Sequence, residues 1–475
     1  MQFSNTWSLR GLGLLLLAGG SAVVAAAGGP KLHVPSPDWR DQVIYFVVTD
    51  RFADGNPRNN DQGAGEYRPQ QPEGWQGGDF AGLRARLPYI QGLGATAVWI
   101  TPPVAQQWLD PTGRHGGYHG YWAEHFMQVD RHLGTLDDYR RLSDALHRAG
   151  MALVQDIVVN HTGNYFAMQP VYAAYLTTPP VARPSQWPFS QNDPRVPAQR
   201  RAGVYHWTPD VTDYNDPVQE ATFQMGGLDD LNTENPLVRR ALRKSYGWWI
   251  REAGVDAFRV DTAFYVPPDF FGDFMHARDP AAPGIAEVAR QTGRRDFLVF
   301  GEGFATDAPG EDKSSRRIER YMRDPQGRPL MNGMLNFPLY GTLGDVFARG
   351  APPAQLADRV RRQLAVHPRL HWMPSFVDNH DVDRFLAGGS EAGWRAAARG
   401  LGPRDLAVGT AQNGTIVNPA FRTFLTSALL DKDSLTVKVE KKGGKGGATV
   451  RICKIDENKK YTNLKTITFE EGEGT

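Results

Sequence analysis

Cysteine is almost absent from this sequence: Cys453 is the one cysteine among 475 residues, so the chain cannot form an internal disulfide. An excess of charge of one sign is absent as well, because 53 lysine and arginine residues against 52 aspartate and glutamate residues leave a net charge of +1. This balance gives no electrostatic reason to expect nucleic acid or an anionic membrane as a partner. After the N-terminal segment, no stretch is long and apolar enough to cross a bilayer. The composition therefore points to neither a nucleic-acid-binding nor a membrane protein.

The N-terminus carries the pattern of a secretory signal peptide. Arg10 precedes an apolar run that is rich in small residues and ends in an A-x-A cleavage motif near Ala27. Such a segment is removed on export, so we expect residues 1–27 to be a signal peptide and the mature protein to be secreted or periplasmic, without a membrane anchor. An exported protein without disulfides often gains its rigidity from metal ions.

Short apolar runs alternate with longer segments of helical character along most of the chain. The runs that we expect to form strands are 43–48, 95–100, 152–159, 256–260, 297–300, 333–337 and 371–377. Strands that alternate with helices imply parallel βαβ units, and continuous apolar runs suit a sheet buried on both faces. Seven or eight such repeats predict an α/β fold, a (β/α)8 TIM barrel, with a doubly wound open sheet as the competing arrangement.

Two features favour the barrel. Polar residues such as Asp261 and Glu302 follow the predicted strands directly, and in a barrel these strand ends converge on one mouth. The interval after the third strand is about twice as long as an ordinary repeat and rich in Pro, Asn, Gln and aromatic residues. We therefore expect an inserted subdomain at 162–230, and a barrel formed by 36–161 and 231–400.

The composition changes abruptly near residue 431. Residues 1–430 contain three lysines, whereas residues 431–475 contain nine lysines and one arginine. Alternating apolar and polar residues predict a small antiparallel β module at 431–475, as a separate domain or a fused segment. The eighth barrel repeat before it is atypical, with 405–408 and 414–417 as candidates for a substitute strand. A missing strand would leave two open sheet edges beside the site.

Three carboxylates follow three separate predicted strands: Asp261 in "FRVDTA", Glu302 in "VFGEGF" and Asp381 in "FVDNHD". Cleavage of a glycosidic bond uses one carboxylate to attack the anomeric carbon and one acid to protonate the leaving oxygen. A single acidic residue at a strand end is usually a loop cap or an ion-pair partner, so the prediction rests on their joint occurrence. Arg259 shares a strand face with Asp261, and we expect it to hold that carboxylate ionised.

Four of the segments resemble, in sequence, order and strand position, the four signature regions of the α-amylase family of glycoside hydrolases. These are "DIVVNH" (156–161), "GVDAFRVDTA" (254–263), "FGEGF" (300–304) and "FVDNHD" (376–381); "GGYHGYW" (116–122) and "LDDLN" (228–232) are similar to two further family segments. The resemblance implies that Asp261 is the nucleophile, that Glu302 is the general acid and then the base, and that Asp381 stabilises the transition state. It further implies that His161 and His380 hydrogen-bond the sugar at the cleavage position and that Tyr118 stacks on it. Asp156 lies within its predicted strand, so we expect it to be a structural hydrogen-bond acceptor rather than a catalyst.

A calcium site is expected near residues 50–61. Asp54, Asn56, Asn59, Asn60 and Asp79 supply carboxylate and amide oxygens around glycine, which suits a hard cation, although an Asn/Gly turn has the same composition. The segment is similar to the calcium loop of cyclodextrin-forming relatives, which implies Ca²⁺ and adds the Gly77 carbonyl. A second site would use Asn160 and Asp230, but the family often adds a histidine where this chain has Tyr265.

The resemblance implies retaining endo-hydrolysis of α-1,4-glucosidic bonds in starch-like glucans by a calcium-dependent, monomeric enzyme of the α-amylase type. A retaining mechanism predicts that the carboxyl groups of Asp261 and Glu302 lie roughly 5–5.5 Å apart. One alternative is a transglycosylase of the same family, cyclodextrin-forming or maltogenic. Another, of a different class, is a glucan-binding protein without catalysis, which the atypical eighth repeat keeps open.

Overall fold

The computed structural model describes residues 30–176, 183–383 and 385, and the backbone of 435–442, 447–455 and 461–469. The expected signal peptide (1–27) and the candidate substitute strands (405–408 and 414–417) lie outside the described residues. Within the described residues, no helix has the length and apolar character that spanning a membrane requires.

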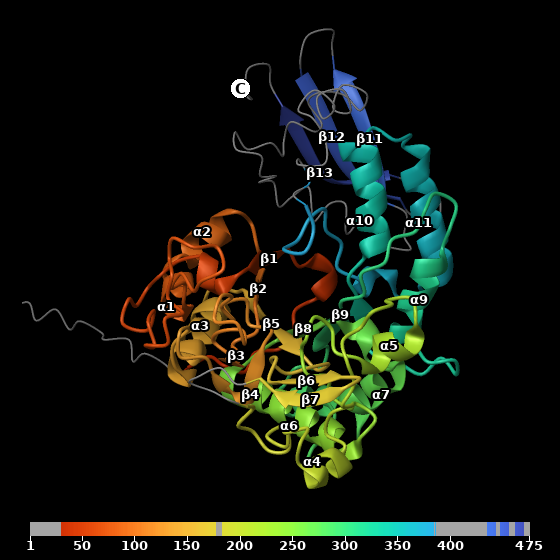
Figure 1. Cartoon of the computed structure of the whole chain (residues 1–475). Helices are drawn as coiled ribbons and strands as arrows, with labels where there is room; N and C mark the ends of the chain where they lie inside the picture. Colours follow the sequence, from red (N-terminus) through yellow and green to blue (C-terminus); the bar gives the residue numbers. More distant parts are fainter. Residues whose placement is uncertain are drawn as a thin grey trace, which may run out of the picture.

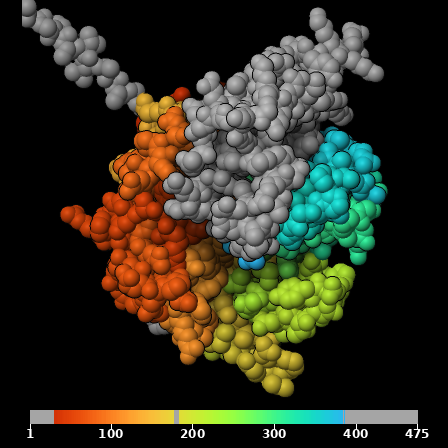
Figure 2. All heavy atoms as spheres, turned by 90° about the horizontal axis from the view of Figure 1, so that it is seen from above, coloured from red at the N-terminus to blue at the C-terminus, as the bar shows by residue number. Residues whose placement is uncertain are grey.

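The central sheet of the described residues consists of six parallel strands that lie side by side in chain order. They are β1 (Ile44–Val47), β2 (Ala97–Ile100), β5 (Ala152–Val158), β8 (Ala257–Asp261), β9 (Leu298–Gly301) and β10 (Gly333–Met334). A doubly wound sheet reverses its strand order part-way across, whereas a barrel does not. These strands thus follow the barrel order, and successive parts of the chain follow one another around the molecule (Figure 1, Figure 2).

Helices connect these strands (Figure 1), and most of them pack on one face of the sheet. They are α1 (Phe80–Ala85), α2 (Leu87–Gly92), α3 (Leu136–Arg148), α6 (Pro236–Ala253), α7 (Pro268–His276), α8 (Ile285–Gln291), α9 (Lys313–Met322), α10 (Phe337–Leu343) and α11 (Ala354–Val366). Local sequence fixes their ends, as α6 illustrates. The side chain of Asn235 accepts a hydrogen bond from the N–H of Leu237 (2.9 Å), and the helix ends at Gly254, whose φ of 71° favours glycine.

Alternate residues of each strand belong to two separate clusters of buried apolar side chains. Val98 and Phe258 pack with helix residues such as Trp249 on the outer face. Ala97 and Ala257, each one position earlier in its strand, belong to a second, inner cluster. Because side chains alternate along a strand, the inner set defines which positions of β5, β8 and β9 point into the interior.

The long interval between β5 and α6 forms irregular structure with short elements, which are the hairpin β6 (Phe166–Gln169) and β7 (Tyr172–Tyr175), α4 (Pro197–Ala202) and α5 (Pro217–Thr222). A second hairpin, β3 (Val104–Gln106) with β4 (Ala123–Val129), lies between β2 and α3. The buried carboxylate of Asp229 ties the inserted interval together, because it accepts hydrogen bonds from the N–H groups of Tyr165 and Phe166 and from the amide of Asn192 (2.8 Å).

The expected strand at 371–377 is wrong. Residues Leu370–Trp372 form a turn of 3₁₀ helix, η5, and in the following segment the carbonyl of Pro374 accepts a hydrogen bond from the N–H of Asn336, two residues after β10 (3.0 Å). Pro374 has no N–H to donate to a strand ladder, which explains the interruption. A cavity of about 580 Å³ lies between β1 and residues 371–380.

The C-terminal segment forms an antiparallel three-stranded sheet in the order β11 (Leu435–Lys442), β12 (Gly447–Ile455) and β13 (Tyr461–Phe469). Apolar and polar residues alternate along these segments of the sequence. This alternation predicts strands, because successive side chains of a strand point to opposite faces.

Candidate active site

The candidate site begins with side chains that point into the interior from adjacent strands. Arg259 and Asp261 follow Ala257 at two-residue intervals in β8, and Asp156 occupies an inward position of the neighbouring β5. Glu302 follows β9 directly, and its N–H donates to the carbonyl of Val260 (2.8 Å), so the backbone places Glu302 beside Asp261.

Arg259 is fully buried and contacts all three of these carboxylates. One guanidinium nitrogen, Nη1, lies 2.9 Å from Asp156 Oδ1 and 2.8 Å from Asp261 Oδ1. The other, Nη2, lies 2.7 Å from Glu302 Oε2. The candidate nucleophile and the candidate acid are therefore held by the two ends of one planar group, which suits Arg better than Lys.

One positive charge does not balance three carboxylates in a space that excludes water. Burial raises the pKa of Asp156 to about 7, and it raises the pKa of Asp261 and of Glu302, although Arg259 opposes each increase. The sequence led us to expect that Arg259 keeps Asp261 ionised. The guanidinium does favour the ionised form, but burial is the larger effect on the pKa of Asp261.

The turn that directly follows β8 is held in a strained backbone conformation. Thr262 has a φ of 46°, which is unfavourable for a β-branched residue, and its N–H donates to Glu302 Oε2 (3.2 Å). The next N–H, that of Ala263, donates to the carbonyl of Glu302 (2.9 Å). The strain is thus compensated by two hydrogen bonds that fix both the backbone and the carboxyl group of Glu302.

Asp381 reaches the same cluster from a loop. Its N–H donates to Asn379 Oδ1 (2.9 Å), and its carboxylate lies 3.2 Å from His380 Nε2. Burial and then the charge of Glu302 raise the pKa of Asp381 to about 6. Its side chain remains 42% exposed, so Asp381 lies on the open side of the cluster.

Two of the predicted substrate-contacting residues meet the cluster through Tyr121, which sequence reasoning missed. The Tyr121 hydroxyl donates to Asp156 Oδ2 (2.9 Å) and lies 2.9 Å from His380 Nε2, and the carbonyl of Tyr121 is 3.1 Å from His161 Nε2. Burial lowers the pKa of His161 to about 4, so its imidazole is neutral.

The ring of the predicted Tyr118 lies under the guanidinium of Arg51, at 3.5 Å. The motif "GGYHGYW" contains both tyrosines, three positions apart, and a loop gives no periodicity that shows which one points inward. The left-handed turn at Gly120, with a φ of 89°, is what directs Tyr121 to the carboxylates.

The predicted calcium ligands of the first set lie together. The amide of Asn60 donates to Asp54 Oδ2 (2.7 Å) and that of Asn59 to Asp79 Oδ2 (3.3 Å). The backbone of Gly77 lies against the Asn60 side chain and has a φ of 97°, so a side chain at this position would collide with Asn60.

The oxygen atoms of this set fit a hard cation. Asn59 Oδ1 and Asn60 Oδ1 are buried and have no hydrogen-bond partner among the described residues. Burial raises the pKa of Asp79 and the charge of Asp54 adds to this increase, while hydrogen bonds from Gly82, Asn59 and Gly55 oppose it. The exposed Asn56 takes part in a turn, in which its carbonyl accepts from the N–H of Asn59 (3.1 Å).

The second predicted calcium pair fits less well. Asn160 and Asp230 lie on adjoining segments, and the N–H of Leu231 donates to the Asn160 carbonyl (2.8 Å). Asp230 Oδ1 is buried without a hydrogen-bond partner, but Asp230 Oδ2 is taken by His206 Nδ1 at 2.5 Å. Burial alone would lower the pKa of His206, yet its bonds to Asp230 and Glu234 raise it to about 9. His206 thus already occupies one oxygen of this carboxylate, whose pKa burial raises to about 7.

The fold and the site together define a singly wound α/β protein whose carboxylates meet at the C-terminal ends of neighbouring parallel strands, as they do in (β/α)8-barrel enzymes. The family model for the alpha amylase catalytic domain matches residues 46–399, about three quarters of the chain. The chain therefore belongs to the α-amylase family of glycoside hydrolases, and its parallel sheet is part of a (β/α)8 barrel.

Individual relatives agree with this assignment. The chain is 33% identical over 353 residues to a beta/alpha-amylase of Paenibacillus polymyxa and 30% identical over 356 residues to a cyclomaltodextrin glucanotransferase of Klebsiella oxytoca. These matches cover 74% and 73% of this chain but 24% and 50% of the two relatives. An α-amylase from Geobacillus thermoleovorans, solved with acarbose, superposes with a TM-score of 0.60 at 25% identity and covers 87% of each chain.

Proposed function

We propose that the protein is a retaining α-amylase that hydrolyses internal α-1,4-glucosidic bonds of starch-like glucans. The observation that carries this proposal is the shared contact of Arg259 with Asp261 and Glu302, which places two carboxyl groups side by side on adjacent strands. Such a pair provides a nucleophile and a proton donor to one glycosidic bond. Family membership and the amylase relatives support the substrate class.

In the proposed reaction, Asp261 attacks the anomeric carbon while Glu302 transfers its proton to the leaving oxygen, so that the glucosidic bond breaks as the bond to Asp261 forms. Glu302, now ionised, takes a proton from water, and the oxygen of that water displaces Asp261. The raised pKa of Glu302 suits the first step, because the group must begin protonated.

The surrounding residues orient the sugar ring and stabilise its positive charge. Asp381 stands on the open side of the cluster, where a carboxylate stabilises an oxocarbenium-like transition state. His161 and His380 flank Tyr121, and we propose that these three residues border the sugar at the cleavage position. The ring of Tyr118 lies under the guanidinium of Arg51.

The test is hydrolysis of soluble starch with analysis of the first products by ¹H NMR. We expect linear maltooligosaccharides that are released as the α-anomer, and a loss of at least about 10³-fold in kcat for Glu302→Gln, which cannot donate a proton. Release of the β-anomer would overturn the retaining mechanism. Starch binding without turnover, unchanged by Glu302→Gln, would overturn the assignment as an enzyme.

A transglycosylase is the second candidate, favoured by the cyclomaltodextrin glucanotransferase of K. oxytoca among the relatives. The same covalent intermediate would then be transferred to a sugar hydroxyl instead of water. Chromatography of the starch digest separates the two, since cyclic or elongated products would replace linear short ones.

We also propose that Ca²⁺ binds Asp54, Asn59, Asn60, Asp79 and the Gly77 carbonyl, where it would cross-link residues 54–60 to 77–79 and compensate the two carboxylates.

The apolar N-terminal segment supports export to the periplasm or the medium, and we expect a monomer. Mass spectrometry of the mature N-terminus and light scattering of the purified protein test these two points.

A further inference from the structure

His132 is a buried histidine that the proposed reaction does not use. It lies in the loop between β4 and α3, with 1% of its surface accessible. Its Nδ1 is 2.7 Å from Asp130 Oδ1, and its Nε2 is 3.1 Å from Glu66 Oε1. Glu66 belongs to the segment between β1 and α1. One imidazole therefore joins carboxylates from two parts of the chain that are distant in sequence.

The surroundings of His132 favour its imidazolium form. Burial alone would lower its pKa, but Asp130 and Glu66 raise the pKa to about 9 through their charges and hydrogen bonds. Both nitrogens of an imidazolium are donors, which matches the two carboxylate partners. Asp50 of η2 (Thr49–Arg51) also interacts electrostatically with His132 and is itself paired with Arg51. At neutral pH the imidazole is thus a cation among carboxylates.

Asp130 extends this contact to residues 107–122, the loop between β3 and β4 that contains Tyr121. Its second oxygen, Oδ2, accepts from the N–H of Gln106 (2.9 Å) and from the indole N–H of Trp108 (3.2 Å). Gln106 Oε1 accepts in turn from the N–H of Trp122 (2.6 Å), the residue after Tyr121. The Asp130 carboxylate thus fixes both ends of the loop that directs Tyr121 to the candidate active site.

The segment between β1 and α1 holds His132 from the other side. Glu66 Oε2 accepts from the N–H of Ala64 (2.8 Å), and the ring of Trp75 stacks on the imidazole with centroids 3.8 Å apart. The Trp75 indole donates to the carbonyl of Trp108 (3.1 Å). The imidazolium therefore lies between two loops, and its charge and both of its N–H groups connect them.

From these contacts we propose that His132 is a positioning residue: it clamps the segment between β1 and α1 to the loop of Tyr121 and so holds the Tyr121 hydroxyl in the carboxylate cluster. The inference rests on the proposed function, in which Tyr121 borders the sugar. The hydroxyl lies 2.9 Å from both Asp156 Oδ2 and His380 Nε2, so a small shift of its loop weakens two contacts of the site.

A double-mutant cycle on maltoheptaose hydrolysis tests whether His132 acts through Tyr121. We expect His132→Gln to lower kcat about fivefold to tenfold in the wild-type background, but less than about twofold in a Tyr121→Ala background, where the residue that it positions is gone. Circular dichroism checks that each variant is folded. Trp108→Phe, which keeps a ring and removes one donor to Asp130, is a milder variant that should show the same dependence on Tyr121.

The pH profile provides a second readout. The Tyr121 hydroxyl donates to Asp156 and thereby favours the ionised form of that carboxyl. Its displacement in His132→Gln leaves more of the Arg259 charge to stabilise ionised Glu302, so kcat/KM should begin to decline at a lower pH than in the wild type.

His147 provides a matched control, because it is also a buried histidine with a carboxylate partner, Asp256 Oδ2 at 2.7 Å. His147→Gln should lower the melting temperature but leave the pH profile in place and kcat within about twofold of the wild-type value. Equal losses of kcat from His132→Gln in both backgrounds, or the same loss in His147→Gln, would overturn the positioning role. If the wild-type protein does not cleave maltoheptaose, the proposed function itself fails, and that result is distinct from additive losses in active variants.

Discussion

Arg259 places one positive charge among Asp156, Asp261 and Glu302, in a space from which burial removes most of the water. The protons of such a cluster are shared, so a change at one carboxyl alters the ionisation of the others. Asp156 is placed to alter the ionisation of Asp261 and Glu302, because it contacts Arg259 and lies farther inside the sheet than these two carboxyl groups.

Asp156→Asn tests this sharing. Without the Asp156 charge, Arg259 is left to stabilise the ionised forms of Asp261 and Glu302, so the pKa of Glu302 should fall. Because the acid must be protonated, kcat/KM declines as the pH rises through that pKa, and the decline should begin about half a pH unit or more lower in the variant. The pH profile of starch hydrolysis measures this shift. Asp358→Asn, which removes a surface ion pair with Arg362, should leave the profile in place.

These residues show what the sequence can and cannot predict at this scale. That Arg259 and Asp261 share one face of β8 follows from strand periodicity, and the place of Glu302 follows from its position after a strand. The raised pKa of Asp261 does not follow, because burial is the sum of contacts from many segments. Nor does the choice between Tyr118 and Tyr121, which depends on the backbone of a loop.

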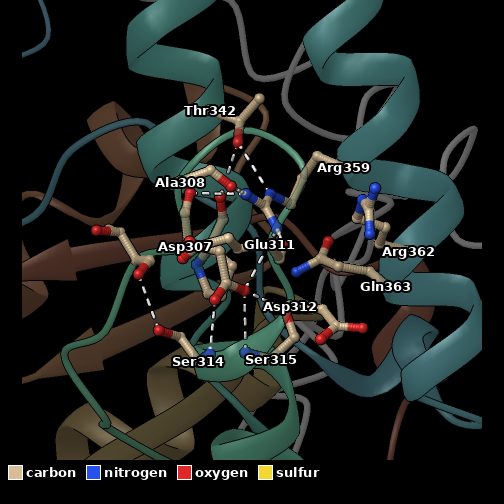
Figure 3. A network of polar contacts seen from close by, with 12 residues as sticks. Asp307, Ala308, Glu311, Asp312, Ser314, Ser315, Thr342, Arg359, Arg362 and Gln363 are labelled. Carbon is tan, nitrogen blue, oxygen red and sulfur yellow. Dashed lines mark hydrogen bonds and ion pairs between the residues drawn. The ribbon is translucent and has the colours of Figure 1, made fainter.

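At the scale of elements, a buried polar network joins the loop after Glu302 to three helices (Figure 3). Arg359 of α11 donates to the carbonyls of Asp307 (2.6 Å), Ala308 (2.9 Å) and Glu311 (2.6 Å), and to Thr342 Oγ1 of α10 (3.1 Å). The Asp307 carboxylate accepts from the N–H groups of two residues in the first turn of α9, Ser314 and Ser315. One guanidinium thus donates to four oxygens from three segments and also contacts the Asp307 carboxylate.

Replacement of Arg359 by Met should therefore lower the free energy of unfolding by about 3–5 kcal/mol, since it leaves the buried Asp307 carboxylate without its cation and removes the donor to several carbonyls. Thermal unfolding followed by circular dichroism measures the loss. Arg361 lies on the same helix with its side chain 72% exposed, and Arg361→Met should change the stability by less than about 0.5 kcal/mol. Equal effects of the two substitutions would show that the network does not stabilise the fold.

The elements themselves were predictable to different degrees. Apolar runs predict β2, β5, β8 and β9 because these strands are buried on both faces. The segment 371–377 looks equally apolar, but Pro374 and the 3₁₀ turn at Leu370–Trp372 keep it from pairing as a strand. A hydrophobic run in the sequence indicates that a segment is buried. It indicates that the segment pairs as a strand only where every backbone N–H is available.

At the scale of the whole molecule, stability depends on how the loops after the strands are held without disulfides. Residues 54–60 and 77–79 are distant from each other in sequence, and two hydrogen bonds to the Asp79 carboxylate connect them, one from the amide of Asn59 and one from the N–H of Gly55. Buried amide oxygens without partners and two neighbouring carboxylates are costly unless a cation compensates them. A bound Ca²⁺ would convert this cost into a cross-link.

Removal of calcium should consequently lower the melting temperature of the wild-type protein. At a free Ca²⁺ concentration of about 100 times Kd, binding stabilises the folded state by about 2.7 kcal/mol, and a chelator removes that contribution. Asn60→Ala should melt at a temperature that depends much less on calcium, because it removes a buried oxygen donor. Asn215→Ala, an exposed asparagine on the inserted interval, should keep the full calcium response. A wild-type melting temperature that is the same with calcium and with chelator would show that the cluster is an Asn/Gly turn whose hydrogen bonds suffice.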